Sequence, residues 1–135
     1  MFLLAFSIRL WSVADSSVSD PAFLYPIIDE QTNVDQARGF LEHGPPHETP
    51  YWKPPGYPAL LALLALPWSD IGSSAQAVPA SFAWTVKIFQ CLLDSISALL
   101  ILQITALTAG RKSALLASGL YAIASMPVFF CGQLL

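Results

Sequence analysis

Two adjacent carboxylates, Asp29 and Glu30, are the residues whose types and spacing most directly suggest chemistry. They open a stretch, residues 31–43, in which Val34, Ala37 and Leu41 would share one helix face. A carboxylate at a membrane surface, partly removed from water, can act as a general base or hold a metal ion. The pair also has a purely structural explanation, because the positive end of a helix dipole favours acidic residues in the first turn.

Lys53 is a lone cation in a stiff segment. Residues 47–58 read His-Glu-Thr-Pro-Tyr-Trp-Lys-Pro-Pro-Gly-Tyr-Pro, so prolines restrict the backbone on both sides of the lysine. An ammonium presented from such a loop suits an anionic headgroup such as a phosphate. Ordinary snorkelling to the membrane surface is the alternative, and for an isolated lysine it is the favoured one.

Asp94 is a carboxylate about two turns inside an apolar segment, a costly placement that usually faces a bundle interior or water. Cys91, Ser95, Ser97 and Ala98 lie near it, so Asp94 marks the polar packing side of this helix. Lys87 lies seven residues earlier on the same face, about 10 Å away along the helix axis, too far for direct pairing. A structural role and a proton-bearing role both remain open for Asp94.

Histidines and cysteines give no predicted metal ligand. His43 and His47 are four positions apart, but Gly44-Pro45-Pro46 interrupts the helix that would align them, so we expect no zinc site. Cys91 and Cys131 fall toward the outer ends of their apolar segments and could lie level with each other. Single thiols in lipid-embedded helices are more often inert, so we expect free cysteines rather than a disulfide.

The composition predicts an integral membrane protein. Only 11% of the 135 residues are charged, against about 25% in soluble domains, while 55% are hydrophobic and the mean hydropathy is +0.57. Residues 88–109 and 114–132 are two apolar spans; the first would be about 33 Å long as a helix, enough to cross a bilayer core of about 30 Å. The net charge of −3 gives no basic surface for nucleic acid.

The distribution of charge predicts the topology. Arg111 and Lys112 lie in a four-residue turn, 110–113, and the positive-inside rule places that turn in the cytoplasm. Residues 15–81 carry eight acids and two bases, so we place this loop outside. Residues 57–68, with only twelve apolar positions, are expected to lie flat at the interface; a crossing would put the acidic loop on the side of Arg111.

The predicted fold is therefore all-α, a polytopic helical membrane protein with a large external first loop that carries juxtamembrane helices at about 30–43 and 57–68. We expect residues 1–14 to be part of a membrane helix, 82–109 and 114–132 to span the membrane, and the whole of 1–135 to be one module. The apolar ends of the chain suggest a fragment of a larger protein.

The order of these features resembles the N-terminal part of GT-C-fold membrane glycosyltransferases, in particular the protein O-mannosyltransferase, aminoarabinose transferase and lipopolysaccharide-core glycosyltransferase group. The resemblance rests on an apolar helix ending near Arg9, then Asp29-Glu30, a short helix, and the Lys53-Pro54-Pro55 step before a Leu-rich run. It extends through Val86-Lys87-Ile88-Phe89-Gln90, Arg111 to Ala117 and Met126-Pro127. It covers nearly all 135 residues, although each motif alone is weak.

The resemblance implies transfer of a sugar from a polyprenyl-phosphate donor to an acceptor hydroxyl or amine at the outer face, with inversion. Asp29 would be the base toward the acceptor, and Glu30 would support it or contribute to a divalent-cation site. Lys53 would contact the lipid phosphate, and Arg9 is the second candidate substrate-binding residue. The partners are then membrane lipids, the lipid-linked donor and an acceptor glycan, lipid or protein, in a bacterial inner or plasma membrane.

Two features depart from that family, and two other functions remain open. Many relatives carry an aromatic residue where this chain has Asn33, and full enzymes have many more spans and further acidic loops. A transporter or channel fragment, with Asp94 and Lys87 along its pathway, is the first alternative. A small non-catalytic membrane assembly protein is the second.

Overall fold

The computed structural model describes residues 1–20, 23–26, 29–44, 54–68, 71 and 77–133. Within these ranges the secondary structure is helical and contains no strand, which confirms the all-α prediction. The helices are α1 (Phe2–Ser19), α2 (Asp29–His43), α3 (Gly56–Ala65), α4 (Ala80–Ile123) and α5 (Ser125–Cys131).

The chain divides into two compact units. Met1–Ser19 and Lys87–Gln133 form unit 1, which therefore contains α1, most of α4 and α5. Asp20–Val86 form most of unit 2, which contains α2, α3 and the first turns of α4.

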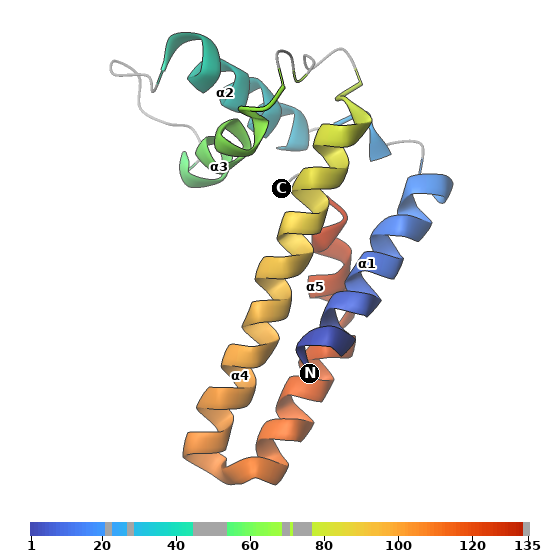
Figure 1. Ribbon diagram of the computed structural model, residues 1–135, viewed down its shortest axis with the longest axis vertical. Coiled ribbons are helices and arrows are strands. Elements are labelled where there is room, and N and C mark those ends of the chain that lie inside the picture. The colour runs from blue at the N-terminus through green and yellow to red at the C-terminus, as the bar shows by residue number, and fades with distance from the viewer. Residues whose placement is uncertain (21–22, 27–28, 45–53, 69–70, 72–76, 134–135) are drawn as a thin grey trace. The chain divides into compact units, whose positions relative to one another are not determined.

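The long helix α4 is a hairpin rather than one straight rod. Gly110 has φ 84° and ψ 167°, so the helix is interrupted there, and Figure 1 shows the chain reversing direction at this point. The Ser118 hydroxyl donates a hydrogen bond of 2.8 Å to the Ala98 carbonyl, which joins the two antiparallel arms. A conformation with this φ and ψ is essentially restricted to glycine, so Gly110 determines where the hairpin turns.

Among the described residues, one helix, Ala80–Ile123, is long and apolar enough to cross a membrane. Two of its four charged residues, Arg111 and Lys112, directly follow the turn and are both exposed. Large apolar side chains cover the outer surface of the two arms, where a water-soluble protein would show a mixture of polar and apolar side chains. They include Leu92, Leu93, Leu100, Ile104, Leu107, Leu115, Leu116 and Leu120.

Small residues form the centre of unit 1. Ala5, Ala98 and Ala122 are fully buried in one cluster, against which Tyr121 packs. Helix α1 also packs against α5, as Figure 1 shows. Alanines at a helix contact let the backbones approach closely, as in membrane helix bundles, where small residues replace bulky apolar ones at the interface.

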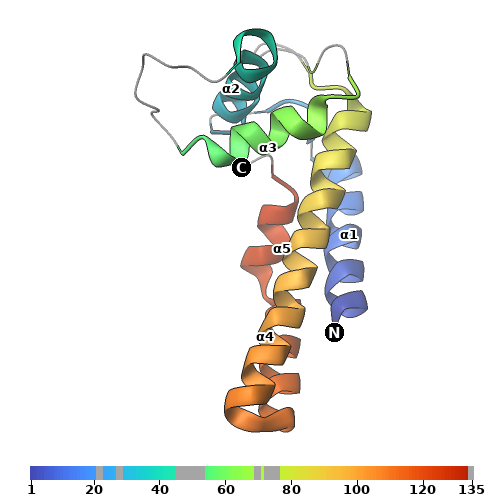
Figure 2. The same ribbon diagram turned by 60° about the vertical axis from the view of Figure 1, so that its left-hand side comes forward.

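Unit 2 is built on the packing of α2 against α3 (Figure 2). Val34 and Ala37 on α2 are fully buried, as are Leu61 and Ala65 on α3. Leu41, the third residue of the predicted apolar stripe, is 40% exposed. The buried face of α2 begins one turn earlier, so it starts at Glu30, and Leu41 lies one turn past its end.

Aromatic contacts hold the segments around the start of α4 within unit 2. The Trp68 indole donates a hydrogen bond of 2.8 Å to the Ser81 hydroxyl, and its ring meets Phe82 edge-on at 5.8 Å between centroids. Phe23 packs on Trp84 with centroids 5.5 Å apart. The helix in the apolar run expected over 57–68 ends at Ala65, and Trp68, the last residue of that run, is hydrogen-bonded to Ser81 near the start of α4.

Candidate functional site

The acidic pair opens α2, and its two side chains lie in different environments. Asp29 is the first residue of α2 and is exposed, whereas Glu30 is only 6% exposed. Consecutive helical residues point about 100° apart, so one carboxylate faces solvent while the next faces the packing surface. Both carboxylates lie in the first turn, where the helix dipole stabilises their negative charge.

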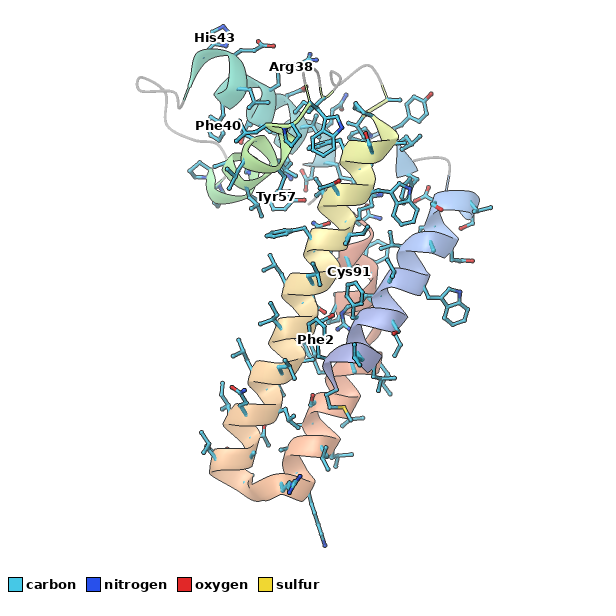
Figure 3. The ribbon with its side chains drawn as sticks, in the orientation of Figure 1. Phe2, Arg38, Phe40, His43, Tyr57 and Cys91 are labelled. Carbon is cyan, nitrogen blue, oxygen red and sulfur yellow. The ribbon has the colours of Figure 1, made fainter. Side chains whose placement is uncertain are left out.

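Tyr57 lies in the first turn of α3 (Figure 3), and the charge of Glu30 acts on its hydroxyl. Burial raises the pKa of Tyr57 well above its ordinary value, and the negative charge of Glu30 raises that pKa further. The phenol therefore stays protonated and remains a hydrogen-bond donor beside a buried carboxylate. This arrangement, which requires α2 and α3 to pack together, was not anticipated from the sequence.

The different exposure of Asp29 and Glu30 would suit them to different roles in general base catalysis. An exposed carboxylate at a helix start can accept a proton from an incoming hydroxyl or amine, because water and substrate both reach it. A buried carboxylate on the next residue, held by the packing of α2 on α3, fixes the orientation of that helix turn. Asp29 is thus the one of the two carboxylates that a solute can reach, whereas Glu30 lies in the packing surface of α2.

Lys53, the predicted contact for a donor phosphate, lies outside the described residues, as does His47. His43 is described, and its Nδ1 lies 3.8 Å from Glu42 Oε2, while Arg38 Nε lies 3.7 Å from Glu42 Oε1. The Arg38–Glu42 contact is a partly exposed ion pair at the end of α2, a kind that typically contributes little to stability.

Arg9, the other predicted substrate-binding residue, is fully buried in unit 1. Its Nε donates to Asp94 Oδ2, and its Nη1 donates to the carbonyls of Ala5 and Ala122 at 3.0 and 3.1 Å. The guanidinium also lies 5.5 Å from the centre of the Tyr121 ring, whose hydroxyl donates to Asp94 Oδ1. We call Arg9, Asp94 and Tyr121 the buried polar cluster.

A break in the helix explains why the Ala122 carbonyl accepts from Arg9. Ala124 is extended, with φ −62° and ψ 129°, so α4 ends at Ile123 and its last carbonyls lose their helical partners. The Ala124 N–H turns back to the Tyr121 carbonyl, and the Arg9 guanidinium takes the Ala122 carbonyl. A cation at this position also interacts favourably with the negative end of the helix dipole.

Asp94 faces the interior side of α4, as its neighbours suggested. Cys91, Ser95 and Ala98 are fully buried, and Asp94 retains one fifth of its side-chain exposure. The sequence indicated only Lys87 as a charged neighbour of Asp94, whereas the structure pairs Asp94 with Arg9. The available signal was that Arg9 and Asp94 are opposite charges, each alone in an apolar segment, and such charges usually pair inside a membrane.

No group of three or more His, Cys, Asp or Glu side chains in the described part of the chain is arranged to hold a metal ion. Comparisons with known proteins give no further guide to function. No family model matches the chain, and neither a curated protein nor a solved structure is similar to it.

Proposed function

We propose that this chain is the N-terminal module of a multi-pass membrane glycosyltransferase that transfers a sugar from a polyprenyl-phosphate donor to a hydroxyl or amine at the outer face. The observation that carries the proposal is the asymmetry of the acidic pair. Asp29 is exposed at the start of α2, while Glu30 is buried and linked electrostatically to Tyr57. One reachable carboxylate beside one fixed carboxylate suits a base that must approach an acceptor in a set orientation.

The membrane arrangement supports the same proposal. The two arms of the α4 hairpin would cross the bilayer in opposite directions, with Arg111 and Lys112 at the cytoplasmic turn. Their exposed leucine and isoleucine side chains would face lipid. The acidic segment, residues 15–81, precedes the first arm in the chain and would then lie outside, where a lipid-linked donor presents its sugar.

In the proposed reaction the acceptor oxygen or nitrogen attacks the anomeric carbon and the bond from that carbon to the lipid phosphate breaks. Asp29 takes the proton from the attacking group, so the new bond forms without leaving a charged acceptor. Lys53 offsets the negative charge that grows on the departing polyprenyl phosphate. The attack from the face opposite the phosphate gives inversion at the anomeric carbon.

Binding of the departing lipid tests the donor side, because polyprenyl phosphate is common to every sugar donor of this class. We expect the full protein in detergent to bind polyprenyl phosphate, and Lys53→Gln to weaken that binding by about 10- to 100-fold, the value of one charged hydrogen bond. Lys112→Gln, at the hairpin turn, is the control and should bind as the wild type does. Absence of polyprenyl-phosphate binding by the wild-type protein would overturn the proposal.

Transfer tests the acceptor side. With polyprenyl-phosphate mannose as the probe, Asp29→Asn should lower the rate of sugar transfer by about 10²- to 10⁴-fold, the usual contribution of a general base, and leave polyprenyl-phosphate binding unchanged. Asp35→Asn removes another exposed acid from α2 and should transfer normally. Full transfer by Asp29→Asn would show that this carboxylate is not the base.

The buried polar cluster favours a transporter as the second candidate, because ionisable groups inside membrane helices often line a transport pathway. In that case Asp94→Asn would abolish transport while Asp29→Asn would be tolerated. The pairing of Asp94 with Arg9 and Tyr121 gives this carboxylate a structural role already. The glycosyltransferase proposal is therefore the better supported of the two.

A further inference from the structure

The two cysteines of the chain, Cys91 and Cys131, come together inside unit 1. Cys91 lies on α4 and is fully buried, and Cys131 is the last residue of α5 and is 4% exposed. Their thiols are hydrogen-bonded to each other, although the residues are 40 positions apart in the chain. Figure 3 shows Cys91 on α4 at the level of α5.

The two thiols lie beside charged groups. The charges of Arg9 and Asp94 both act on each thiol, so the pair lies beside the buried polar cluster and not in a purely apolar layer. Arg9 favours the thiolate, which is the nucleophile in disulfide exchange, whereas burial and the Asp94 charge oppose it, so the case for reaction rests on the proximity of the two thiols. Two thiols in contact also satisfy the main requirement for a disulfide, which is proximity of the two sulfur atoms.

Cys91 and Cys131 are less suited to binding a soft metal ion than to forming a disulfide. A closed thiolate site usually takes three or four ligands, and the described residues offer no group of three His, Cys, Asp or Glu side chains that could hold a metal. Asp94, the acid whose charge acts on both thiols, already accepts from Arg9 and Tyr121.

We propose that Cys91 and Cys131 are a disulfide-forming pair, oxidised by low-molecular-weight disulfides, that covalently joins α5 to α4. One cysteine thiolate attacks a sulfur of the small disulfide, which forms a mixed disulfide and releases one small thiol. The second cysteine thiolate then attacks the protein sulfur of the mixed disulfide and displaces the second small thiol. The two protons lost by the cysteines leave with the two released thiols, so the reagent is reduced and the protein is oxidised.

The helix break at Ala124 provides the access that two buried thiols need. Helix α5 has seven residues and is separated from α4 by one extended residue. Rotation about this residue would move Cys131 away from Cys91 without unfolding the α4 hairpin. Exchange should therefore be slower than for an exposed thiol, because the reagent reacts only while α5 is displaced.

Oxidation of the full chain with glutathione disulfide tests the pair. We expect a monomer that has lost two hydrogen masses, a peptide linking Cys91 to Cys131 after proteolysis, and a higher Tm that a reductant reverses. Cys91→Ser and Cys131→Ser should each abolish the linked peptide and the reversible rise in Tm. Because the chain has two cysteines, no other intramolecular disulfide can produce this result.

Moving the α4 thiol to another position tests whether the disulfide requires two neighbouring thiols or only two reactive ones. It also provides a second test if a serine variant folds poorly. Cys91→Ser combined with Gln103→Cys keeps two cysteines but places the α4 thiol twelve residues along the helix, about 18 Å away, at an exposed position. This variant should give glutathione adducts or intermolecular dimers and no intramolecular link. Wild-type protein that yields only adducts or dimers, with Cys91 and Cys131 unlinked, would overturn the proposal.

Discussion

Unit 1 and unit 2 each bury a carboxylate near a tyrosine, but they use the two groups differently. In unit 1, Asp94 accepts from the Arg9 guanidinium and from the Tyr121 hydroxyl, so its charge is neutralised within the helix packing. In unit 2, Glu30 acts on Tyr57 by raising the pKa of a phenol that is already buried, and an exposed acid, Asp29, stands next to it. The polar groups of unit 1 hold helices together, whereas those of unit 2 leave a reachable carboxylate at the surface.

The difference follows from where each carboxylate sits on its helix. Asp94 lies in the middle of an apolar arm, where an unpaired charge is costly, so a cation from another helix must accompany it. Glu30 lies in the first turn of α2, where unpaired backbone N–H groups and the helix dipole already favour negative charge. A helix start can therefore carry two acids and expose one of them, while the middle of an apolar arm cannot.

The largest effect should come from separating the ion pair of unit 1. Asp94→Ala leaves the Arg9 guanidinium buried without its carboxylate, and we expect it to lower the free energy of unfolding by about 3–5 kcal/mol. Thermal unfolding of the full chain in detergent, with hydrogen exchange read on α1, measures this loss.

A double variant tests the cause of that loss. Arg9→Met combined with Asp94→Leu removes both charges together and should recover most of the lost stability, since apolar replacements of a buried pair are often tolerated. A double variant as unstable as Asp94→Ala would show that the pairing of these two charges is not what unit 1 requires.

An intermediate effect should come from the hairpin turn of unit 1. Gly110→Ala forces a side chain into a backbone conformation that only glycine adopts readily, with no crowding atom within 4 Å of the new Cβ. We expect a loss of about 1–3 kcal/mol in the free energy of unfolding from backbone strain alone.

Gly119→Ala is the matched control for Gly110→Ala, since Gly119 also has open space around it but lies within the returning arm. Alanine there should stabilise the helix by about 0.5–1 kcal/mol because it restricts the unfolded chain. Equal thermal unfolding temperatures for the two variants would contradict the assignment of Gly110 as the residue that sets the turn.

The smallest effect should be a pH dependence confined to unit 2. The pKa of Tyr57 is raised in the folded protein, so this group contributes stability that is fully present below its unfolded pKa of about 10 and is lost as the pH rises further. Hydrogen exchange of α2 and α3, corrected for the intrinsic effect of pH, should accelerate above about pH 10 in the wild type.

Tyr57→Phe should flatten this dependence, since phenylalanine has no proton to lose. Tyr25→Phe changes an exposed tyrosine of the same unit and should keep the wild-type acceleration. Protection of α1 in unit 1 should be the same in both variants. A Tyr57→Phe protein that still loses protection in α2 and α3 with the wild-type profile would contradict a role for this phenol.

Local patterns in the sequence predicted a substantial part of the fold. Helical periodicity and the run of uncharged residues predicted that the chain is helical, and composition predicted an apolar segment long enough to cross a membrane. The helix expected over 30–43 begins at Asp29 in the structure and ends at His43. Such features are predictable because side chains three and four positions apart share a face in any helix.

Other features of the candidate site depended on how helices pack. The sequence identified Asp29 and Glu30 as a pair, but only the packing of α2 on α3 made Glu30 buried and Asp29 exposed. The roles assigned to Asp29, Glu30, Lys53 and Arg9 stay predictions. Arg9 already donates hydrogen bonds to Asp94 and to two backbone carbonyls, so a phosphate could bind Arg9 only by replacing these acceptors.

The sequence by itself determined the elements of this protein: helices, apolar arms, a glycine between them and an acidic helix start, all of which follow from side chains near one another in the chain. Only the tertiary structure decided which distant groups meet, since Arg9 pairs with Asp94 across 85 positions and Cys91 meets Cys131 across 40. The physical reason is that periodicity specifies the face of each helix but not its neighbour. The neighbour is selected by close packing of small residues and by the cost of leaving a buried charge unpaired.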